Sequence, residues 1–236
     1  MKKIIITILM LSGMFSTVSA EIGVNIGVSG QIGTMESSGK EVSSATSTTR
    51  NSDKEKTIFA TGGIFVEKDL AFLPFFLGKI GKRIHIGYDN ISHDLNFGTI
   101  KNTRSSTLGD AAGAGTIAGA HNHTLKAKMT AFETTYATFN ITDWLYVKTG
   151  NVSVDIETKF TGTSTSSYGT KHGLDGTVFG VGIQKMSENG LFFRVEYNDY
   201  DIDGKSVVNA GADSVFTATL NDVSGDTTRL SIGKAF

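Results

Sequence analysis

The chain has 236 residues, of which 28 are glycine, one is proline and none is cysteine, and its formal net charge is −1. The lack of cysteine excludes a disulfide framework and a thiolate metal site, and the near-neutral charge gives no support to a nucleic-acid partner, which would need a basic stripe. Because glycine, serine and threonine are abundant, the composition favours turns and strands over helices.

The first twenty residues predict a cleaved export signal. Two lysines precede an apolar core at residues 4–14, and small residues precede Glu21, the expected start of the mature chain. The apolar run is too short to cross a bilayer core of about 30 Å as a helix, which needs about 20 residues. We therefore expect residues 1–20 to be removed and residues 21–236 to form one domain.

Eight segments alternate between apolar and polar residues with the period of two that is typical of strands. In the first, Val24, Ile26 and Val28 share one face, and the residues between them are small or polar. Each segment is near the roughly 9–11 residues that a tilted strand needs to cross a bilayer, and an even number of strands can close an antiparallel barrel. The predicted strands lie at residues 22–33, 58–66, 83–91, 124–139, 144–157, 177–186, 191–200 and 226–236.

Soluble sandwiches show the same alternation, with the apolar face pointing inward. Here the polar faces carry glycine and serine with few charges, the links alternate in length, and aromatic residues lie near strand ends as in the interfacial girdles of membrane barrels. The sequence therefore predicts an all-β fold, an eight-stranded antiparallel up-and-down transmembrane β-barrel. The expected girdle residues are Phe139, Trp144, Phe192, Phe193, Tyr197, Tyr200 and Phe236.

The links between the predicted strands alternate in length. Residues 140–143 and 187–190 predict tight periplasmic turns. Residues 36–57 have the serine- and threonine-rich composition of a mobile, solvated loop. The long polar links that predict extracellular loops lie at residues 34–56, 92–123, 158–175 and 201–216.

Two regions depart from this pattern. The alternation is lost near Phe132 and Glu133, and a bulge near Gly150 would reconcile the two parities within residues 144–157. The link after the second strand is long, and its residues 70–80 are strongly apolar. A short interfacial helix, a hydrophobic hairpin and an extension packed under the barrel mouth all fit that segment.

The alternating segments resemble the eight-stranded outer-membrane barrels of the OmpA, OmpX and opacity-protein type. The resemblance covers the mature chain as a pattern and is carried most by residues 180–184, 191–197 and 229–236. It implies a location in the cell outer membrane, among outer-membrane lipid and lipopolysaccharide. It also implies contact with the barrel-assembly machinery during biogenesis, through a terminal signal formed by Leu230, Ile232 and Phe236. Unlike full-length OmpA, the chain is expected to carry no peptidoglycan-binding domain after the barrel.

Charged residues on the polar faces would point into the lumen of this barrel. An isolated charge in a narrow lumen is costly, so opposite charges are expected to pair. An eight-stranded barrel is just wide enough to be filled by its own side chains. The set predicts either a structural plug of ion pairs or a gateable path for small ions. Its members are Arg83, Asp89, Glu133, Asp155, Glu157, Arg194, Glu196 and Arg229.

No group of residues predicts catalysis, a metal site or a cofactor. His121 and His123 follow a tract of small residues that would not order a metal site. His172 stands in a glycine-rich link without an evident partner for a hydrolase. The stretch 109–119 lacks the Gly-Lys-Ser/Thr ending of a phosphate loop. We expect neither a cofactor nor enzyme activity.

The sequence thus predicts an outer-membrane barrel protein with a structural and surface-interaction role. Four extracellular loops would be displayed to an unknown extracellular surface partner. Two alternatives stay open: a narrow, low-conductance channel through the lumen, and an enzyme at the barrel rim that acts on outer-membrane lipid.

Overall fold

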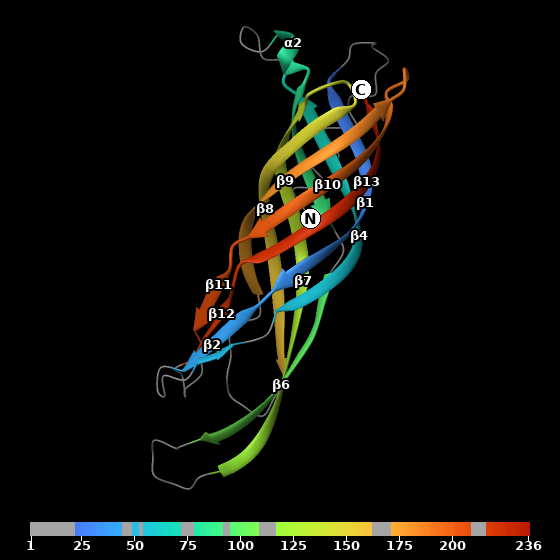
Figure 1. Ribbon diagram of the computed structural model, residues 1–236. Helices are drawn as coiled ribbons and strands as arrows, with labels where there is room; N and C mark the ends of the chain where they lie inside the picture. Colours follow the sequence, from blue (N-terminus) through green and yellow to red (C-terminus); the bar gives the residue numbers. More distant parts are fainter. Residues whose placement is uncertain are drawn as a thin grey trace.

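Eight antiparallel strands form the wall of a barrel (Figure 1). The computed structural model describes residues 22–43, 49–51, 54–71, 78–91, 95–108, 117–161, 171–208 and 216–236, so the predicted export signal lies outside the described residues. The wall strands are β1 (Val24–Ser37), β4 (Glu55–Asp69), β5 (Ile84–Ile91), β7 (Ile117–Asn140), β8 (Leu145–Thr161), β9 (Lys171–Met186), β10 (Leu191–Ile202) and β13 (Val223–Ala235).

The barrel closes because β5 pairs with β7 as well as with β4. All eight predicted segments coincide with these strands, so the predicted eight-stranded antiparallel barrel is confirmed. When cross-strand partners are followed once around the wall from Ile26, the path returns to β1 at Glu36, a stagger of 36 − 26 = 10 residues. With about 4.8 Å between strands and 3.3 Å per residue, this stagger tilts the strands by roughly 40°.

Additional strands lie at the end of the barrel where the sequence predicted extracellular loops, and we call this the extracellular end (lower part of Figure 1). The links after β1 and β10 contribute β2 (Gly39–Ser43) and β3 (Thr49–Asn51), and β11 (Lys205–Val208) and β12 (Phe216–Leu220). These form a sheet in the order β11-β12-β2-β3. The predicted mobile loop at residues 36–57 is therefore wrong for its described part, because β12 supplies backbone partners to β2.

A second extension continues the wall on the β5–β7 side. β6 (Leu95–Leu108) pairs with the first half of β7 and projects beyond the barrel (Figure 1). The link 92–123, predicted as a loop, is thus largely strand in its described part. β6 pairs with residues 117–129 of β7 and so continues the β5–β7 ladder toward the extracellular side.

The opposite end of the barrel, which we call the periplasmic end, carries the tight links and the C-terminus (upper part of Figure 1). In the turn between β7 and β8, the Leu145 N–H donates to Thr142 Oγ1 at 2.9 Å. The apolar link after β4 contains α2 (Gly78–Gly81). Residues 72–77 of the predicted apolar segment lie outside the described residues. Among the described residues, no helix has the length and apolar character needed to span a membrane.

The apolar face of the wall changes sides along the barrel axis. On β10, Phe193 and Val195 are exposed near the periplasmic end, whereas Asp199 and Asp201 are exposed nearer the extracellular end. The side chains of this strand alternate without a break between exposed and buried. We call the periplasmic half the lower wall and the extracellular half the upper wall, although Figure 1 draws the periplasmic end at the top. The lower wall turns apolar residues outward, as a lipid-facing band requires, and the upper wall turns them inward like a soluble barrel.

This inversion explains the irregular segments of the sequence. Val152 and Val154 are each 1 % exposed and face the interior, and the β7–β8 register runs unbroken across Gly150. The predicted bulge at Gly150 is therefore wrong, because the register shifts instead between Met129 and Ala131.

The predicted aromatic girdle is also correct only in part. Phe139, Trp144, Phe193 and Tyr197 are exposed on the outer wall. Phe192 and Tyr200 are buried in the lumen, because they occupy the inward parity of β10.

Candidate functional site

The lumen gathers the buried charges of the barrel and is the candidate site. Three acidic and three basic side chains form three ion pairs within it, and each of these side chains is at most 7 % exposed. The three positive and three negative charges cancel. The members are Glu67, Asp89, Lys148, Arg194, Glu196 and Arg229, and we call them the ion-pair network.

The first pair joins Arg194 of β10 to Glu67 of β4. Arg194 Nη1 and Nη2 donate to Glu67 Oε1 and Oε2 at 2.5 and 2.8 Å, a bidentate geometry. The Glu67 carboxylate accepts two further hydrogen bonds, one from Asn25 Nδ2 at 3.0 Å and one from Tyr136 Oη at 3.0 Å. Because β1 and β13 lie between β4 and β10, this pair braces non-neighbouring strands.

The second pair joins Lys148 of β8 to Glu196 of β10. Lys148 Nζ donates to Glu196 Oε1 at 2.9 Å, and Asn198 Nδ2 donates to the same oxygen at 2.8 Å. Tyr146 Oη donates to the other oxygen at 2.8 Å. Lys148 Nζ also lies 4.5 Å from the centre of the Tyr136 ring, where a cation is attracted to the aromatic face.

The third pair joins Arg229 of β13 to Asp89 of β5, with Arg229 Nη1 donating to Asp89 Oδ2. β4 and β1 separate these two strands in the wall. All three pairs therefore link strands that share no backbone ladder.

Inward-facing glycines make room for the tyrosine rings. A Cβ atom at Gly182 would lie 2.3 Å from Tyr146, and one at Gly87 would lie 2.4 Å from Tyr136. Each glycine belongs to a strand next to that of its tyrosine. These close approaches let both tyrosine hydroxyls reach the carboxylates of the network.

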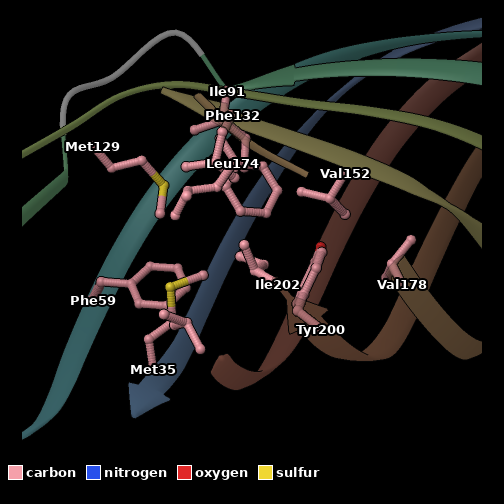
Figure 2. Packing of buried hydrophobic residues seen from close by; sticks show 12 residues of the cluster. Met35, Phe59, Ile91, Met129, Phe132, Val152, Leu174, Val178, Tyr200 and Ile202 are labelled. Carbon is pink, nitrogen blue, oxygen red and sulfur yellow. The ribbon is translucent and has the colours of Figure 1, made fainter. Parts of the chain in front are cut away.

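An apolar layer fills the lumen on the extracellular side of the ion-pair network (Figure 2). Phe132 and Tyr200 meet edge to face with ring centres 5.3 Å apart. The layer occupies the inward positions of the upper wall, where the outer face is polar. Its buried members are Met35, Phe59, Ile91, Met129, Phe132, Val152, Val154, Leu174, Val178, Tyr200, Ile202 and Val223.

Four of the eight predicted lumen charges lie in the network: Asp89, Arg194, Glu196 and Arg229. The other four lie elsewhere, and their predicted location is wrong. Arg83 precedes β5 at the periplasmic end, where its Nη1 donates to the Ile141 carbonyl at 3.0 Å.

Glu133, Asp155 and Glu157 belong to the upper wall and lie on its outer face. Asp155 Oδ2 lies 2.9 Å from Lys171 Nζ, and Glu157 Oε2 lies 3.9 Å from Lys128 Nζ. Because the apolar residues of this part of β7 and β8 point inward, the polar face that the sequence assigned to the lumen is the outer one.

Sequence reasoning missed Glu67 and Lys148, which are among the most deeply buried side chains. Both continue the inward parity of a predicted strand: Glu67 follows Phe65 by two positions, and Lys148 follows Tyr146 by two. Extension of the predicted segment 58–66 by one residue would have found Glu67. Lys148 already lies within the predicted strand 144–157, on the parity opposite Leu145 and Val147. Tyr136 and Tyr146 carry no comparable signal, because a tyrosine suits either face of a strand.

The outer face of the upper wall carries exposed ion pairs. Lys54 Nζ donates to Glu36 Oε1 at 2.5 Å, and this hydrogen bond holds the pKa of Glu36 below its ordinary value. The hydrogen bond from Lys171 to Asp155 raises the pKa of Lys171. Such solvated pairs contribute little stability, but they require an aqueous level outside the barrel here.

The histidines singled out in the sequence lie on strands. His172 is half-buried in β9 and does not stand in a loop. His121 and His123 belong to β7, and their side chains lie outside the described ones. Among the described residues, no three acidic, histidine or cysteine side chains are placed to hold a metal ion.

The outer surface at the periplasmic half is a continuous apolar band. Its exposed members include Val28, Ile64, Val181, Phe193 and Leu230. Two residues of the predicted assembly signal lie on this face of β13: Leu230 is 61 % and Ile232 41 % exposed. A closed antiparallel barrel with such a band is an outer-membrane barrel, because closure satisfies every backbone group within the hydrocarbon.

No family model matches the chain, and no curated protein matches its sequence. Among solved structures it is similar to the outer membrane protein OprG from Pseudomonas aeruginosa (12% identity, TM-score 0.44, covering 92% of this chain and 97% of that one). It is also similar to the outer membrane protease OmpT from Escherichia coli (11%, 0.44, 94% and 99%). A third is Ail, the attachment invasion locus protein of Yersinia pestis (8%, 0.30, 85% and 97%). A protease and an attachment protein together favour neither enzyme activity nor its absence.

Proposed function

We propose that this protein is a closed outer-membrane barrel with a structural and surface-interaction role, whose extracellular strands contact a partner outside the cell. The observation that carries the proposal is the filling of the lumen by two layers in series. The neutral ion-pair network lies on the periplasmic side, and the apolar layer lies on the extracellular side.

The ion-pair network supports a structural role because its bonds cross between non-adjacent strands. Each carboxylate accepts hydrogen bonds from a cationic partner, and two of them also accept from tyrosine and asparagine side chains. Removal of one partner of such a buried pair typically costs about 3–5 kcal/mol, since the other charge is left unpaired. The network therefore fixes the cross-section of the barrel.

The apolar layer weighs against a narrow channel. A permeant ion would have to displace the side chains of the network and then shed its water among residues such as Phe132 and Val178, which are 3 % and 2 % exposed. An uncompensated charge in an apolar environment costs many kcal/mol. The low-conductance channel remains the alternative, and its path would pass the charges of the network.

Labelling of single cysteines tests the closed lumen, since the chain has no cysteine of its own. Val178→Cys lies in the apolar layer, and Lys185→Cys on the exposed periplasmic end of β9 is the matched control. In vesicles opened to both sides, we expect a small hydrophilic thiol reagent to label the control and spare Val178→Cys. Equal labelling rates would contradict a closed lumen.

The sheet formed by β2, β3, β11 and β12 supports the surface-interaction role. It unites the links after β1 and β10 into one ordered platform. The platform is joined to the extracellular end of β1 at Ser38, the residue after this strand. There Asn221 N–H donates to the Ser38 carbonyl at 3.0 Å, and Asn221 Nδ2 donates to Ser38 Oγ at 2.9 Å. A fixed platform loses less conformational entropy on binding than a mobile loop does.

Removal of the β11–β12 hairpin tests this role. Replacement of residues 205–220 by a short glycine-serine link should abolish adhesion of expressing cells to host or bacterial surfaces and leave barrel folding intact, as judged by heat-modifiable migration on gels. Unchanged adhesion of a variant that folds normally would contradict a role for the platform.

A further inference from the structure

The lipid-facing band has a level periplasmic edge. Lys68, Lys185 and Lys234 mark it on β4, β9 and β13, each with its side chain on the outer face. Lys68 stands opposite Val24 and Lys234 opposite Ile26 on β1. When the stagger of the tilted strands is included, the three lysines lie within about 3 Å of the same level.

The extracellular edge of the same band is uneven. On β4 the next outward charge above Lys68 is Lys56, which is 68 − 56 = 12 residues away. On β13 the next outward charge above Lys234 is Asp226, which is 234 − 226 = 8 residues away. At about 3.3 Å per residue and a tilt of roughly 40°, these spans are about 30 Å and about 20 Å.

The outward residues between these charges are consistent with a longer apolar span on β4 than on β13. Five outward positions separate the charges on β4, and its uppermost apolar residue, Ile58, is 73 % exposed. Only three separate them on β13, and the third is Thr228. The usual apolar band of an outer-membrane barrel is about 25 Å tall, so β4 exceeds it and β13 falls short.

Two aspartates mark the low edge. Asp199 of β10 stands directly opposite Asp226 of β13 on the outer face. Like charges at opposed positions repel, and hydrocarbon would strengthen the repulsion and add the cost of desolvation. Tyr197 lies two positions below Asp199 and is 50 % exposed, as is typical of an aromatic residue at a membrane interface.

A polar hollow lies at the step between the low and high edges. Its volume is about 160 Å³, enough for several water molecules or part of a lipid head group. Thr34 Oγ1 donates to Asp226 Oδ1 at 3.1 Å within it. The lining residues are Thr34, Glu36, Lys56, Asp199, Ser224, Gly225 and Asp226.

We propose that polar head groups of the outer leaflet descend to Asp199 and Asp226, so that the hydrocarbon is locally thinned beside β10 and β13. Hydrocarbon of greater depth covers β1 and β4, where Ile32 and Ile58 face it. The barrel thus presents a shallow and a deep side to the same membrane. Deformation of this kind costs fractions of a kcal/mol per Å of mismatch, less than burial of two opposed carboxylates would cost.

Folding into bilayers of different thickness tests the proposal. The protein and the variant Asp199→Asn/Asp226→Asn are refolded into phosphatidylcholine vesicles with acyl chains of 12 or 14 carbons, and urea unfolding gives the folded-to-unfolded ratio. We expect the change to thicker vesicles to favour the variant over the original chain by roughly tenfold. Asp222→Asn, at an exposed position outside the band, is the control and should behave like the original chain.

Parallel responses of the original chain and the double variant would overturn the proposal. A response that depends on the protein-to-lipid ratio would also overturn it, because a second copy seated on the two aspartates would then explain their exposure. Stability of the double variant in the thinner vesicles shows that the comparison is made on a folded barrel.

Depth measurement by fluorescence quenching gives an independent readout. The chain has one tryptophan, so Trp144→Phe provides a background for Ile58→Trp or Tyr197→Trp. In a flat membrane, position 58 lies about 14 Å further toward the extracellular side than position 197, from the register and tilt. We expect lipids brominated within the acyl chain to quench the tryptophan of Ile58→Trp at least as strongly as that of Tyr197→Trp. Quenching of Ile58→Trp by aqueous iodide alone would overturn the deep side.

Discussion

Arg194 and Glu67 meet inside the barrel through two parallel hydrogen bonds of 2.5 and 2.8 Å, although they are 127 residues apart in the chain. The pair is almost completely buried, with side-chain exposures of 7 % and 1 %. It brings β10 and β4 to a fixed separation across the lumen. The proposed structural role of the lumen depends on such bonds between strands that do not pair.

The first prediction concerns the cost of breaking this pair. Arg194→Leu should lower the free energy of unfolding by about 3–5 kcal/mol, because Glu67 would be left as an unpaired buried charge. The double variant Arg194→Leu/Glu67→Leu should be destabilised less than Arg194→Leu alone. Urea unfolding in vesicles measures Arg194→Leu, Glu67→Leu and the double variant. A double variant that loses the sum of the two single losses would argue against coupling.

Close packing at Gly182 yields a second prediction. Gly182→Ala should destabilise the barrel by about 1–3 kcal/mol, since the added Cβ would lie 2.3 Å from Tyr146 and displace its hydroxyl from Glu196. Gly30→Ala is the matched control, because a Cβ at Gly30 meets nothing within 4 Å. Equal unfolding midpoints for the two variants would contradict the packing described.

The inversion of the wall yields a third prediction. Ile202→Asp should prevent folding or cost several kcal/mol, because a carboxylate would enter the apolar layer. Asp201→Asn, one residue away on the outer face, should change stability by less than about 0.5 kcal/mol. Heat-modifiable migration and urea unfolding distinguish the outcomes, and a tolerated Ile202→Asp would show that this end of the lumen is hydrated.

The exposed pair of Glu36 and Lys54 yields a fourth prediction, on pH. Because the pKa of Glu36 is lowered in the folded state, its small contribution to stability is present above the pKa of the unfolded chain and is lost as the pH falls through the folded pKa. Lys54→Met should return the pKa of Glu36 toward its ordinary value. Carboxyl NMR titration measures this shift, and an unchanged pKa would mean that the pair does not persist in solution.

Alternation along the sequence was sufficient to predict the eight wall strands and their antiparallel closure. It also found four members of the ion-pair network, because Asp89, Arg194, Glu196 and Arg229 lie in the lower wall, where the polar face is the inner one. For these residues, the face that the alternation identifies as polar is also the face that points into the lumen.

The same alternation could not predict the inversion in the upper wall. A period of two separates the faces of a strand without showing which one points inward. Asp155 and Glu157 were therefore assigned to the lumen with Arg194, although Val152 and Val154 occupy the inner face of their strand. Only the depth of each residue along the barrel axis decides its direction, and depth follows from the register of all eight strands.

The extracellular platform was hidden for a different reason. β2 and β3 have the composition of a solvated loop. β2 is ordered by pairing with β12, more than 160 residues away in the chain, and β3 pairs with β2. Composition reports local propensity and carries no information on such long-range pairing. The order of the platform, on which the proposed surface-interaction role depends, is therefore seen only in the structure.

Single-channel recording in planar bilayers tests the closed lumen most directly. The purified barrel should give no reproducible openings in 1 M salt, because the ion-pair network and the apolar layer block the lumen in series. Arg194→Ala alone should stay silent, since the apolar layer persists. Reproducible openings of the unmodified protein, with a conductance that changes in Arg194→Ala, would contradict the closed barrel and establish a channel through the network.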